Sequence, residues 1–227
     1  MFGKKLSDIN TKKNHKSDYF SKSGLIAHNK NYSFYMKKKL EGFFNSTNEY
    51  FLLEFNDRNY NQFNYYRIKP NNNFLYKKNL IYFLFSKNKI FLKKSRSKRI
   101  ILNKHKIQSI KNKYWGSILT LFNSKKLNLA AKIIYMNKNT QSSLEYHLNK
   151  SESYFILDGK LTLGLRYGRA KQSILNLNKY NSFDMSPGIM HMRIAKLNSV
   201  IVEVSSFDDD SDSNIVEDGK KFKFSLR

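Results

Sequence analysis

Two histidines and two glutamates in the C-terminal half are the side chains best suited to carry chemistry. Glu145 and His147 lie two positions apart, Glu152 follows His147 at five positions, and His191 lies further along the chain. Because alternate residues of a strand point to the same face, Glu145 and His147 would face the same way. Imidazole and carboxylate groups together suit Zn²⁺, Mn²⁺ or Fe²⁺. Singly, each residue has a plainer interpretation, as a packed histidine or a solvated carboxylate, so the case depends on their joint occurrence.

The elements that must position these residues are short and strand-like. Ala130 to Met136, Ser153 to Leu157 and Lys160 to Leu165 are apolar runs, and the last alternates as a half-buried strand does. Asp158-Gly159 is a strong two-residue hairpin turn. No stretch shows a convincing 3.6-residue apolar period. The pattern therefore predicts an all-β chain, with the regular strand spacing of a sandwich or barrel.

An internal echo links the two halves of the chain. Tyr82 to Leu92 is similar to Tyr154 to Leu163, and Leu102-Asn-Lys104 matches Leu177-Asn-Lys179. A spacing of about 71–75 residues fits one small barrel followed by another. The echo favours a degenerate copy of the second domain in the first half. The alternative is that both halves simply use the same hairpin chemistry.

The chain of 227 residues has a formal net charge of +25. Residues 1–110 hold 24 Lys and Arg against 6 Asp and Glu, whereas residues 111–227 hold 18 against 11. The abundant Lys, Asn, Ile, Phe and Tyr all have A/T-rich codons, so genome bias explains much of this charge. The tightest basic cluster, Lys93 to Arg99, is the first place to look for phosphate contacts. The absence of cysteine excludes disulfides and thiolate metal sites, and it suits a reducing compartment.

Composition divides the chain into four segments. These are a basic, poorly ordered arm (1–45), a β-rich domain (46–110), the domain with the candidate site (111–218) and a basic tail (219–227). The start of the chain has no apolar run of the kind found in signal peptides. The longest apolar run, Leu80 to Phe85, is too short to cross a bilayer. We therefore expect a soluble, cytoplasmic protein without a membrane partner.

Two segments resemble the metal-binding motifs of the cupin superfamily. Ser143 to Gly159 is similar to the first motif, in which two ligands lie two residues apart and a Glu and a hairpin Gly follow. Asn178 to His191, with Pro187-Gly188 at its turn, is similar to the second motif. The common His-x-His pattern is replaced here by a pair that begins with Glu145.

The ends of the domain resemble one branch of that superfamily. Lys113-Tyr-Trp-Gly116 is similar to the entry element of mannose-6-phosphate isomerase-like cupins, including the C-terminal domain of bifunctional isomerase/guanylyltransferase enzymes. Val202-Glu-Val-Ser-Ser206 and Ile215-Val-Glu-Asp218 are similar to the closing elements. The resemblance covers residues 111–218 and implies a cupin double-stranded β-helix, or jelly-roll barrel, there. Together with the echo, it predicts a bicupin whose N-terminal half is degenerate.

The resemblance also implies a ligand set. His147, Glu152 and His191 would bind a divalent metal, Zn²⁺ in first place and Mn²⁺ or Fe²⁺ as alternatives. Glu145 would be either a fourth ligand or a catalytic base. The histidines outside the motifs, His15, His28 and His105, are expected on the surface.

The activity implied is aldose–ketose isomerisation of a sugar phosphate such as mannose 6-phosphate, in nucleotide-sugar or polysaccharide precursor metabolism. In that chemistry a metal polarises the carbonyl or enediolate oxygen, while a base moves a proton between C1 and C2. Lys132, Lys150 and Arg193 are candidates for phosphate or sugar contacts.

Two other functions stay open. A non-catalytic sugar-binding or regulatory cupin would keep the barrel without a competent base, and the unusual Glu145 favours it. A basic nucleic-acid-binding protein would stack bases on the interleaved Tyr and Phe of the first half. The chain has no recognised RNA-binding signature, so nucleic acid is not the expected partner. A homodimer is expected, because cupin barrels often hide edge strands by pairing.

Overall fold

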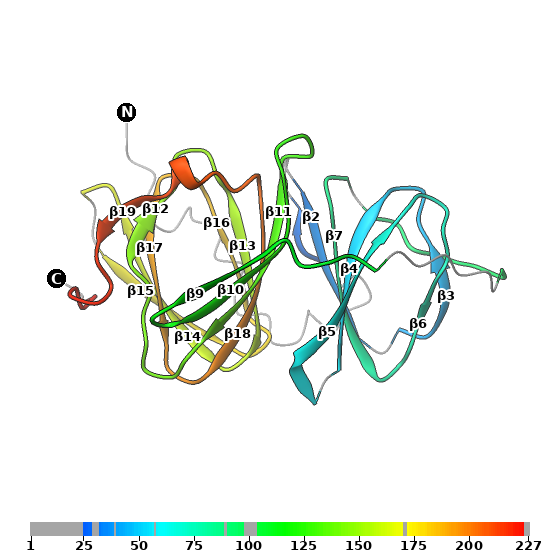
Figure 1. Ribbon diagram of the computed structural model, residues 1–227, viewed down its shortest axis with the longest axis horizontal. Coiled ribbons are helices and arrows are strands. Elements are labelled where there is room, and N and C mark those ends of the chain that lie inside the picture. The colour runs from blue at the N-terminus through cyan, green and yellow to red at the C-terminus, as the bar shows by residue number, and fades with distance from the viewer. Residues whose placement is uncertain are drawn as a thin grey trace.

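The fold consists of two β-sandwich units that lie next to each other (Figure 1). The computed structural model describes residues 25–28, 32–38, 40–56, 58–88, 90–97, 104–169 and 172–224. The first unit comprises β1 (Leu25–His28), β2 (Ser33–Lys38), β3 (Gly42–Asn45), β4 (Tyr50–Asn56), β5 (Asn59–Ile68), β6 (Phe74–Tyr76), β7 (Leu80–Ser86) and β8 (Lys93–Lys94). The second comprises β9 (Ser109–Lys113), β10 (Gly116–Ser124), β11 (Leu129–Met136), β12 (Leu144–Tyr146), β13 (Glu152–Asp158), β14 (Lys160–Tyr167), β15 (Ser173–Asn178), β16 (Ser182–Met185), β17 (Ile189–Ala195), β18 (Ser199–Ser205), the 3₁₀ helix η3 (Asp210–Asp212) and β19 (Asn214–Glu217). Within these ranges, no helix has the length and apolar character needed to cross a bilayer.

The second unit is built from two antiparallel sheets that face each other. The six-stranded sheet has the order β16-β13-β18-β11-β10-β9, and the five-stranded sheet has the order β15-β14-β17-β12-β19. From β11 onward the chain passes back and forth between the two sheets, which is the jelly-roll arrangement expected for residues 111–218. The tight turn expected at Asp158-Gly159 joins β13 to β14, but the expectation of a hairpin is wrong, because the two strands lie in different sheets and pair with other strands. Gly159 has a φ of 89°, and a Cβ there would lie 2.4 Å from the carbonyl oxygen of Asn198, so the turn requires glycine.

The first unit repeats this topology with three strands fewer among the described residues. Its five-stranded sheet, β1-β2-β7-β4-β5, follows the order of β10-β11-β18-β13-β16, and its three-stranded sheet, β6-β3-β8, follows the order of β17-β12-β19. Among the described strands, β9, β14 and β15 have no counterpart. In place of β14 and β15, β4 is followed directly by its neighbour β5. The chain is therefore all-β, with a jelly-roll barrel in the C-terminal half and a reduced version of it in the N-terminal half.

The internal echo does not align equivalent strands. It pairs Tyr82 to Leu92 with Tyr154 to Leu163, which equates β7 with β13. By position in the sheet, the counterpart of β7 is β18, and the counterpart of β13 is β4. The similarity reflects the same strand composition in both halves, so the duplication is visible in the topology and not in the sequence.

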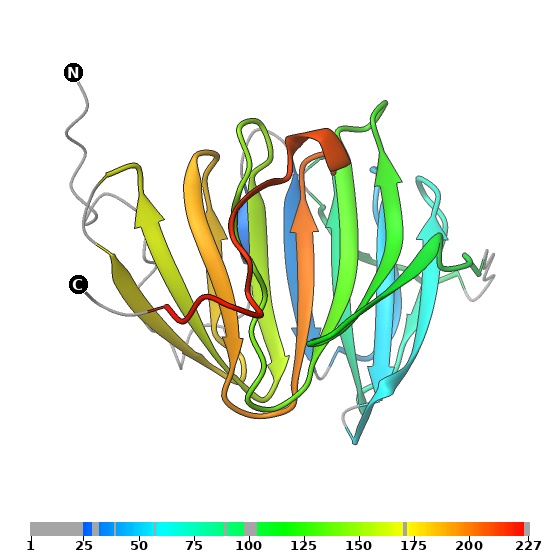
Figure 2. The ribbon, with the colours of Figure 1, turned by 60° about the vertical axis from the view of Figure 1, so that its left-hand side comes forward.

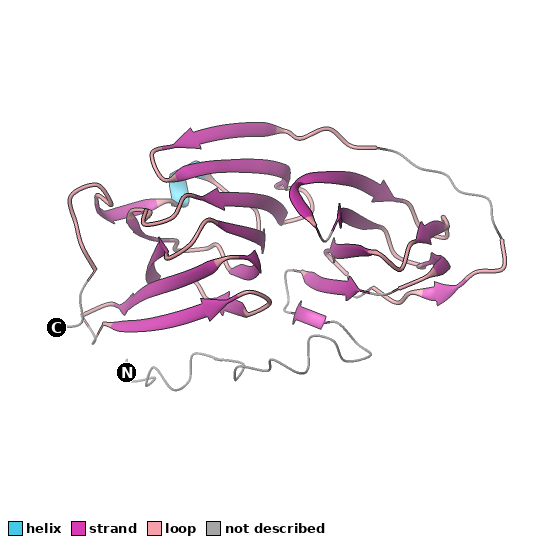
Figure 3. Cartoon of the chain, turned by 90° about the horizontal axis from the view of Figure 1, so that it is seen from below, coloured by secondary structure: helices cyan, strands magenta, loops and turns pink. Residues whose placement is uncertain are grey.

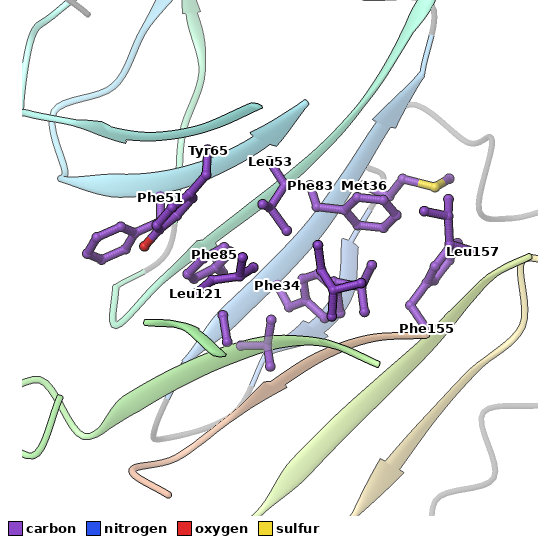
Figure 4. Packing of buried hydrophobic residues seen from close by; sticks show 14 of the residues in the cluster. Phe34, Met36, Phe51, Leu53, Tyr65, Phe83, Phe85, Leu121, Phe155 and Leu157 are labelled. Atoms are coloured by element: carbon purple, nitrogen blue, oxygen red, sulfur yellow. The ribbon is translucent and has the colours of Figure 1, made fainter. Parts of the chain in front are cut away.

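A shared hydrophobic core joins the two units. The five-stranded sheet of the first unit packs its outer face on the outer face of the six-stranded sheet, through Phe34, Phe83, Phe155, Val202 and their neighbours (Figure 4). Seen from below, the strands of the two units form adjacent sandwiches (Figure 3). Alternate residues of β7 and β13 point inward to the separate cores of their own units. The sequences of these strands are continuous apolar runs because both of their faces are buried.

The expected arm of residues 1–45 is wrong in its second part. Residues 33–38 form β2 and residues 42–45 form β3, and the side chains of Phe34 and Met36 are fully buried in the shared core. The lysines that surround these two residues in the sequence hide the apolar alternation when the segment is judged by its composition. Residues 1–24 lie outside the described residues. Part of the expected tail also packs on the barrel, because the Gln141 side-chain amide donates to the backbone carbonyl of Gly219 at 2.7 Å.

Candidate metal centre

The four predicted site residues meet inside the second unit. Glu145 on β12 lies directly opposite His191 on β17 in the five-stranded sheet. His147 follows β12, and the turn at Gly188 holds its backbone, since the Gly188 N–H donates to the His147 carbonyl at 2.7 Å. Glu152 begins β13 in the facing six-stranded sheet. Both sheets therefore contribute to one interior cluster.

Both imidazoles point the same nitrogen into the cluster. His147 Nδ1 lies 2.9 Å from the carbonyl oxygen of Asp212, and His191 Nδ1 lies 3.0 Å from the carbonyl oxygen of Ile189. A carbonyl can only accept, so each Nδ1 carries the proton and each Nε2 presents a lone pair. His191 Nε2 is buried and has no hydrogen-bond partner among the described residues. Burial also lowers the pKa of His191, against the pull of Glu152 and Glu145.

Glu145 completes a group of three residues whose ligand atoms lie within 4.8 Å of one another, together with His147 and His191. Its Oε1 accepts from Arg193 Nη2 at 2.7 Å, and its Oε2 accepts from the Ser213 hydroxyl at 3.2 Å. Burial by itself would raise the pKa of Glu145, but Arg193 and the two imidazoles outweigh it and lower the pKa. The carboxylate is therefore charged near neutral pH.

Glu152 lies between the two imidazoles and a buried lysine. Its Oε1 is 3.6 Å from His147 Nε2 and 2.5 Å from Lys150 Nζ. Its Oε2 is 3.4 Å from His191 Nε2 and accepts from the Tyr154 hydroxyl at 3.0 Å. Burial would raise its pKa, yet Lys150 and the imidazoles hold the pKa of Glu152 well below its usual range.

A network of buried ion pairs extends from Glu152 along the inner face of the six-stranded sheet. Lys150 Nζ also lies 3.2 Å from Glu203 and 2.7 Å from Asp208, and Lys132 Nζ lies 2.6 Å from Asp208. Lys150 is 4% exposed, so its charge is compensated by these carboxylates and not by water. Sequence reasoning missed Glu203 and Asp208 as site residues. The available signal was a glutamate inside the apolar run of β18, since a buried carboxylate requires a cation.

Arg193 is held between two aromatic rings beside the cluster. Its guanidinium carbon lies 5.6 Å from the centre of the Trp115 ring and 5.8 Å from that of Tyr154. Its Nε is buried and has no hydrogen-bond partner among the described residues. One donor of a fixed guanidinium thus stays available next to the carboxylate of Glu145.

Glu145, His147 and Glu152 of the cluster line a cavity of about 210 Å³ that opens to solvent. All three cations expected to contact substrate, Lys132, Lys150 and Arg193, line it. The ammonium groups of Lys132 and Lys150 are already paired with carboxylates, as described above. Lys111 and Lys113 on β9 also line the cavity and are exposed. A phosphate outside the cluster would meet these two lysines before reaching the buried ones.

The donor set fits a divalent transition metal. The Nε2 atoms of both imidazoles, that of His191 buried without a hydrogen-bond partner among the described residues, face the same space as the carboxylates of Glu145 and Glu152. Zn²⁺, Mn²⁺ and Fe²⁺ all accept such nitrogen and oxygen ligands. Both Nδ1–H groups have backbone carbonyl partners, which is the usual outer arrangement of metal-binding histidines. His105 is exposed, as expected, whereas His15 lies outside the described residues and nothing is described of the His28 side chain.

The first unit has a different interior. Tyr50, Tyr76 and Tyr82 are fully buried there, and the hydroxyl groups of Tyr50 and Tyr76 are 3.1 Å apart. Aromatic side chains thus make up much of the interior of the first unit. Among the described residues, the group able to hold a metal lies in the second unit.

Comparison with known proteins identifies the fold. No family model matches the chain, and neither does any curated protein. Procruciferin, an 11S globulin from Brassica napus, superposes with a TM-score of 0.56 at 10% identity, over 83% of this chain and 78% of that one. The coconut allergen cocosin superposes with a TM-score of 0.54 at 8% identity, over 79% of this chain and 78% of that one. Both alignments cover most of the chain, so they include both of its units.

These globulins are bicupins, and the chain has the cupin fold, in the form of one full and one reduced cupin unit. The capsular polysaccharide assembling protein CapF from Staphylococcus aureus aligns with a TM-score of 0.42 at 13% identity, over 48% of this chain. The chain spans only 31% of the length of that protein. At these identities the likeness defines the fold, and the chemistry of the site has to be argued from its own residues.

Proposed function

We propose that the second unit binds a divalent transition-metal ion, Zn²⁺ in first place, and a small anionic ligand of the sugar-phosphate class in the adjoining cavity. One observation carries the proposal. The Nε2 atoms of His147 and His191 converge with the carboxylates of Glu145 and Glu152, and backbone carbonyls fix both Nδ1 protons. A purely structural cluster has no need of an unpartnered buried Nε2.

The charge around the cavity supports an anionic ligand. The ionised side chains of the cluster are four carboxylates and three cations: Glu145, Glu152, Glu203, Asp208, Lys132, Lys150 and Arg193. With neutral imidazoles they leave a formal charge of −1, which a divalent ion converts to +1. A positively charged cavity attracts an anion.

The role that best fits the resemblance is aldose–ketose isomerisation. A bound metal supplies the Lewis acidity that such a reaction needs. Glu145 lines the cavity and would move the proton between two neighbouring carbons, and the Arg193 guanidinium, which also lines the cavity, would bind a sugar or phosphate oxygen. The phosphate would extend toward Lys113 at the opening, for which the described residues offer no carboxylate partner.

A sugar-binding protein without catalysis is the second candidate, and one contact favours it. Arg193 binds Glu145 at 2.7 Å and contributes to its lowered pKa. A carboxylate with a lowered pKa is a weak base, which is the reverse of the usual tuning of a catalytic glutamate. If Glu145 is bound by both Arg193 and the metal, it cannot act as a catalytic base. The site then binds a sugar and does not catalyse its isomerisation.

Metal analysis tests the proposal. The purified protein is expected to bind about one transition-metal ion per chain, and His147→Ala and His191→Ala should each lose it. His105→Ala is the matched control, because His105 is exposed and outside the cluster. Unchanged metal content in both site variants, with the fold intact, would contradict the proposal.

Turnover separates the two candidates. The metal-loaded protein should interconvert mannose 6-phosphate and fructose 6-phosphate if it is an isomerase, and Glu145→Gln should abolish turnover while mannose 6-phosphate still binds. Binding without turnover in the unaltered protein would favour the sugar-binding candidate.

A further inference from the structure

The segment from Ser206 to Glu217 closes over the candidate metal centre from the outside. It leaves β18 in the six-stranded sheet, passes through η3 and ends as β19 at the edge of the five-stranded sheet. Figure 2 shows it running from η3 down across the barrel. β19 pairs with β12, so Ile215 lies opposite Glu145. We call residues 206–217 the closing segment.

Asp212 in this segment binds the turn that carries His147. Its Oδ1 accepts from the backbone N–H of Leu148 at 2.8 Å, and its Oδ2 accepts from those of Asn149 and Lys150 at 3.0 Å each. Its own carbonyl oxygen lies 2.9 Å from His147 Nδ1. One residue therefore holds the imidazole and the three backbone groups that follow it.

These contacts determine how the ligand atoms are presented. The bond from Nδ1 fixes the tautomer of His147, so that Nε2 is the free acceptor. The bonds to the turn fix the backbone from which the Lys150 side chain reaches Glu152. The neighbouring Ser213 donates its hydroxyl to Glu145 Oε2 at 3.2 Å. Three of the four members of the cluster are thus oriented from the closing segment.

The other acidic residues of the segment have different contacts. Asp208 pairs with the two buried lysines. Asp209 caps η3 by accepting from the Ser211 backbone N–H. Asp210 has an 88% exposed side chain near Lys111. Asp212 is the member of this acidic run whose carboxylate is bound by backbone N–H groups of the turn after His147.

We propose that Asp212 is a positioning residue for the metal centre, which holds His147 and the Leu148–Lys150 turn in the geometry that binds a metal ion. The inference rests on the metal site of the proposed function. In metal proteins, residues that hydrogen-bond to the metal ligands hold those ligands in position, and their loss typically weakens metal binding about 10–100-fold. We assign this role to Asp212.

Asparagine is an informative substitution at this position. It keeps one acceptor oxygen but replaces the other with an NH₂ group that would face the N–H groups of the turn. Asp212→Asn should therefore bind metal nearly as weakly as Asp212→Ala. Asp210→Asn removes the same charge from the same segment without touching the turn, and it serves as the matched control.

Two measurements on the full chain test the proposal. In a Co²⁺ titration followed by visible absorption, Asp212→Ala and Asp212→Asn should bind about 10–100-fold more weakly than the unaltered protein, with changed bands, while Asp210→Asn stays unchanged. In the metal-free protein, ¹⁵N NMR of His147 should show a protonated Nδ1, and this tautomer should become mixed in the Asp212 variants.

The outcomes separate this inference from the proposed function. Folded Asp212 variants with unaltered Co²⁺ affinity, bands and His147 tautomer would overturn the positioning role. If the unaltered protein binds no Co²⁺, the proposed function fails, and the tautomer measurement alone decides whether Asp212 orients His147. Should Asp212→Ala not fold, Asp212→Asn, which retains one acceptor, carries the same comparison.

Discussion

Replacing Lys150 by methionine would test the energetics of the buried cluster. The ammonium group of Lys150 contacts Glu152, Glu203 and Asp208 at 2.5, 3.2 and 2.7 Å, and its side chain is 3% exposed. Methionine keeps most of the unbranched stem, so the change removes a charge and little packing. Removing one partner of a buried ion pair costs about 3–5 kcal/mol, because the remaining charge is left uncompensated. That is a large part of the roughly 5–15 kcal/mol by which proteins are folded.

Urea unfolding of the metal-free protein at pH 7 measures this loss. Trp115, the single tryptophan, is 4% exposed and packs beside Arg193, so its fluorescence reports the second unit. Lys111→Met is the matched control. The pair that Lys111 forms with Asp210 has side chains that are 52% and 88% exposed, and such pairs contribute less than about 1 kcal/mol.

The pH dependence adds a second signature. With Lys150 present, the pKa of Glu152 is well below its usual range. Without this cation, burial dominates and raises the pKa in the folded state above the unfolded value of about 4.3. A raised carboxyl pKa means that the folded state takes up a proton first, so the deficit of Lys150→Met should shrink as the pH falls from 7 toward 5. A loss below about 1 kcal/mol at pH 7, or a deficit that does not change with pH, would refute the reasoning.

Three further predictions follow from other contacts. In the unaltered protein, the lowered pKa of buried His191 means that the unfolded chain takes up a proton first, so thermal midpoints by circular dichroism should begin to fall below about pH 6.5. The lowered pKa values of Glu152 and Asp208 contribute stability that is present above their unfolded values, so the midpoints should fall further below about pH 4. Phe155→Ala opens the shared core and should cost about 3–5 kcal/mol in one unfolding transition for both units; two separate transitions would show that the units are independent. Lys113→Ala should weaken binding of a phosphorylated sugar in calorimetry and leave its unphosphorylated form unaffected, whereas Lys106→Ala, exposed outside the cavity, should change neither.

The barrel was predictable because its signals are local. The turn at Asp158-Gly159, the strand at Lys160 to Leu165 and the spacing of Glu145, His147 and Glu152 all depend on residues close together in the chain, and the fold confirms the turn and the strand. The turn connects two sheets and is not a hairpin, and the strand is buried on both faces from Leu161 to Leu165. The geometry also brings the four candidate residues together. Whether they bind a metal stays a prediction, since the fold alone does not decide it.

The partners of the lysines were not predictable, because they come from distant strands. Lys132 and Lys150 were expected to meet a phosphate. Glu203 reaches Lys150 from β18, and Asp208 reaches it from the closing segment, both more than fifty positions away in the chain. Such pairs depend on sheet order, which no single strand encodes. The strands at residues 33–38 and 42–45 were missed for a related reason, since Phe34 and Met36 are buried in a core that distant strands of both units form.

The reduced first unit explains how the barrel tolerates so many charges. On β11, β13 and β18, the residues that face inward near the site are polar, including Lys132, Glu152 and Glu203. Residues on the opposite face of the same strands, such as Phe155 and Val202, pack on the first unit. A sheet whose inner face carries charged side chains buries less apolar surface within its own barrel. Apolar burial in the shared core, on the outer face of the same sheet, offsets that loss of stability. The first unit thus stabilises the six-stranded sheet, which positions Glu152 and the buried lysines.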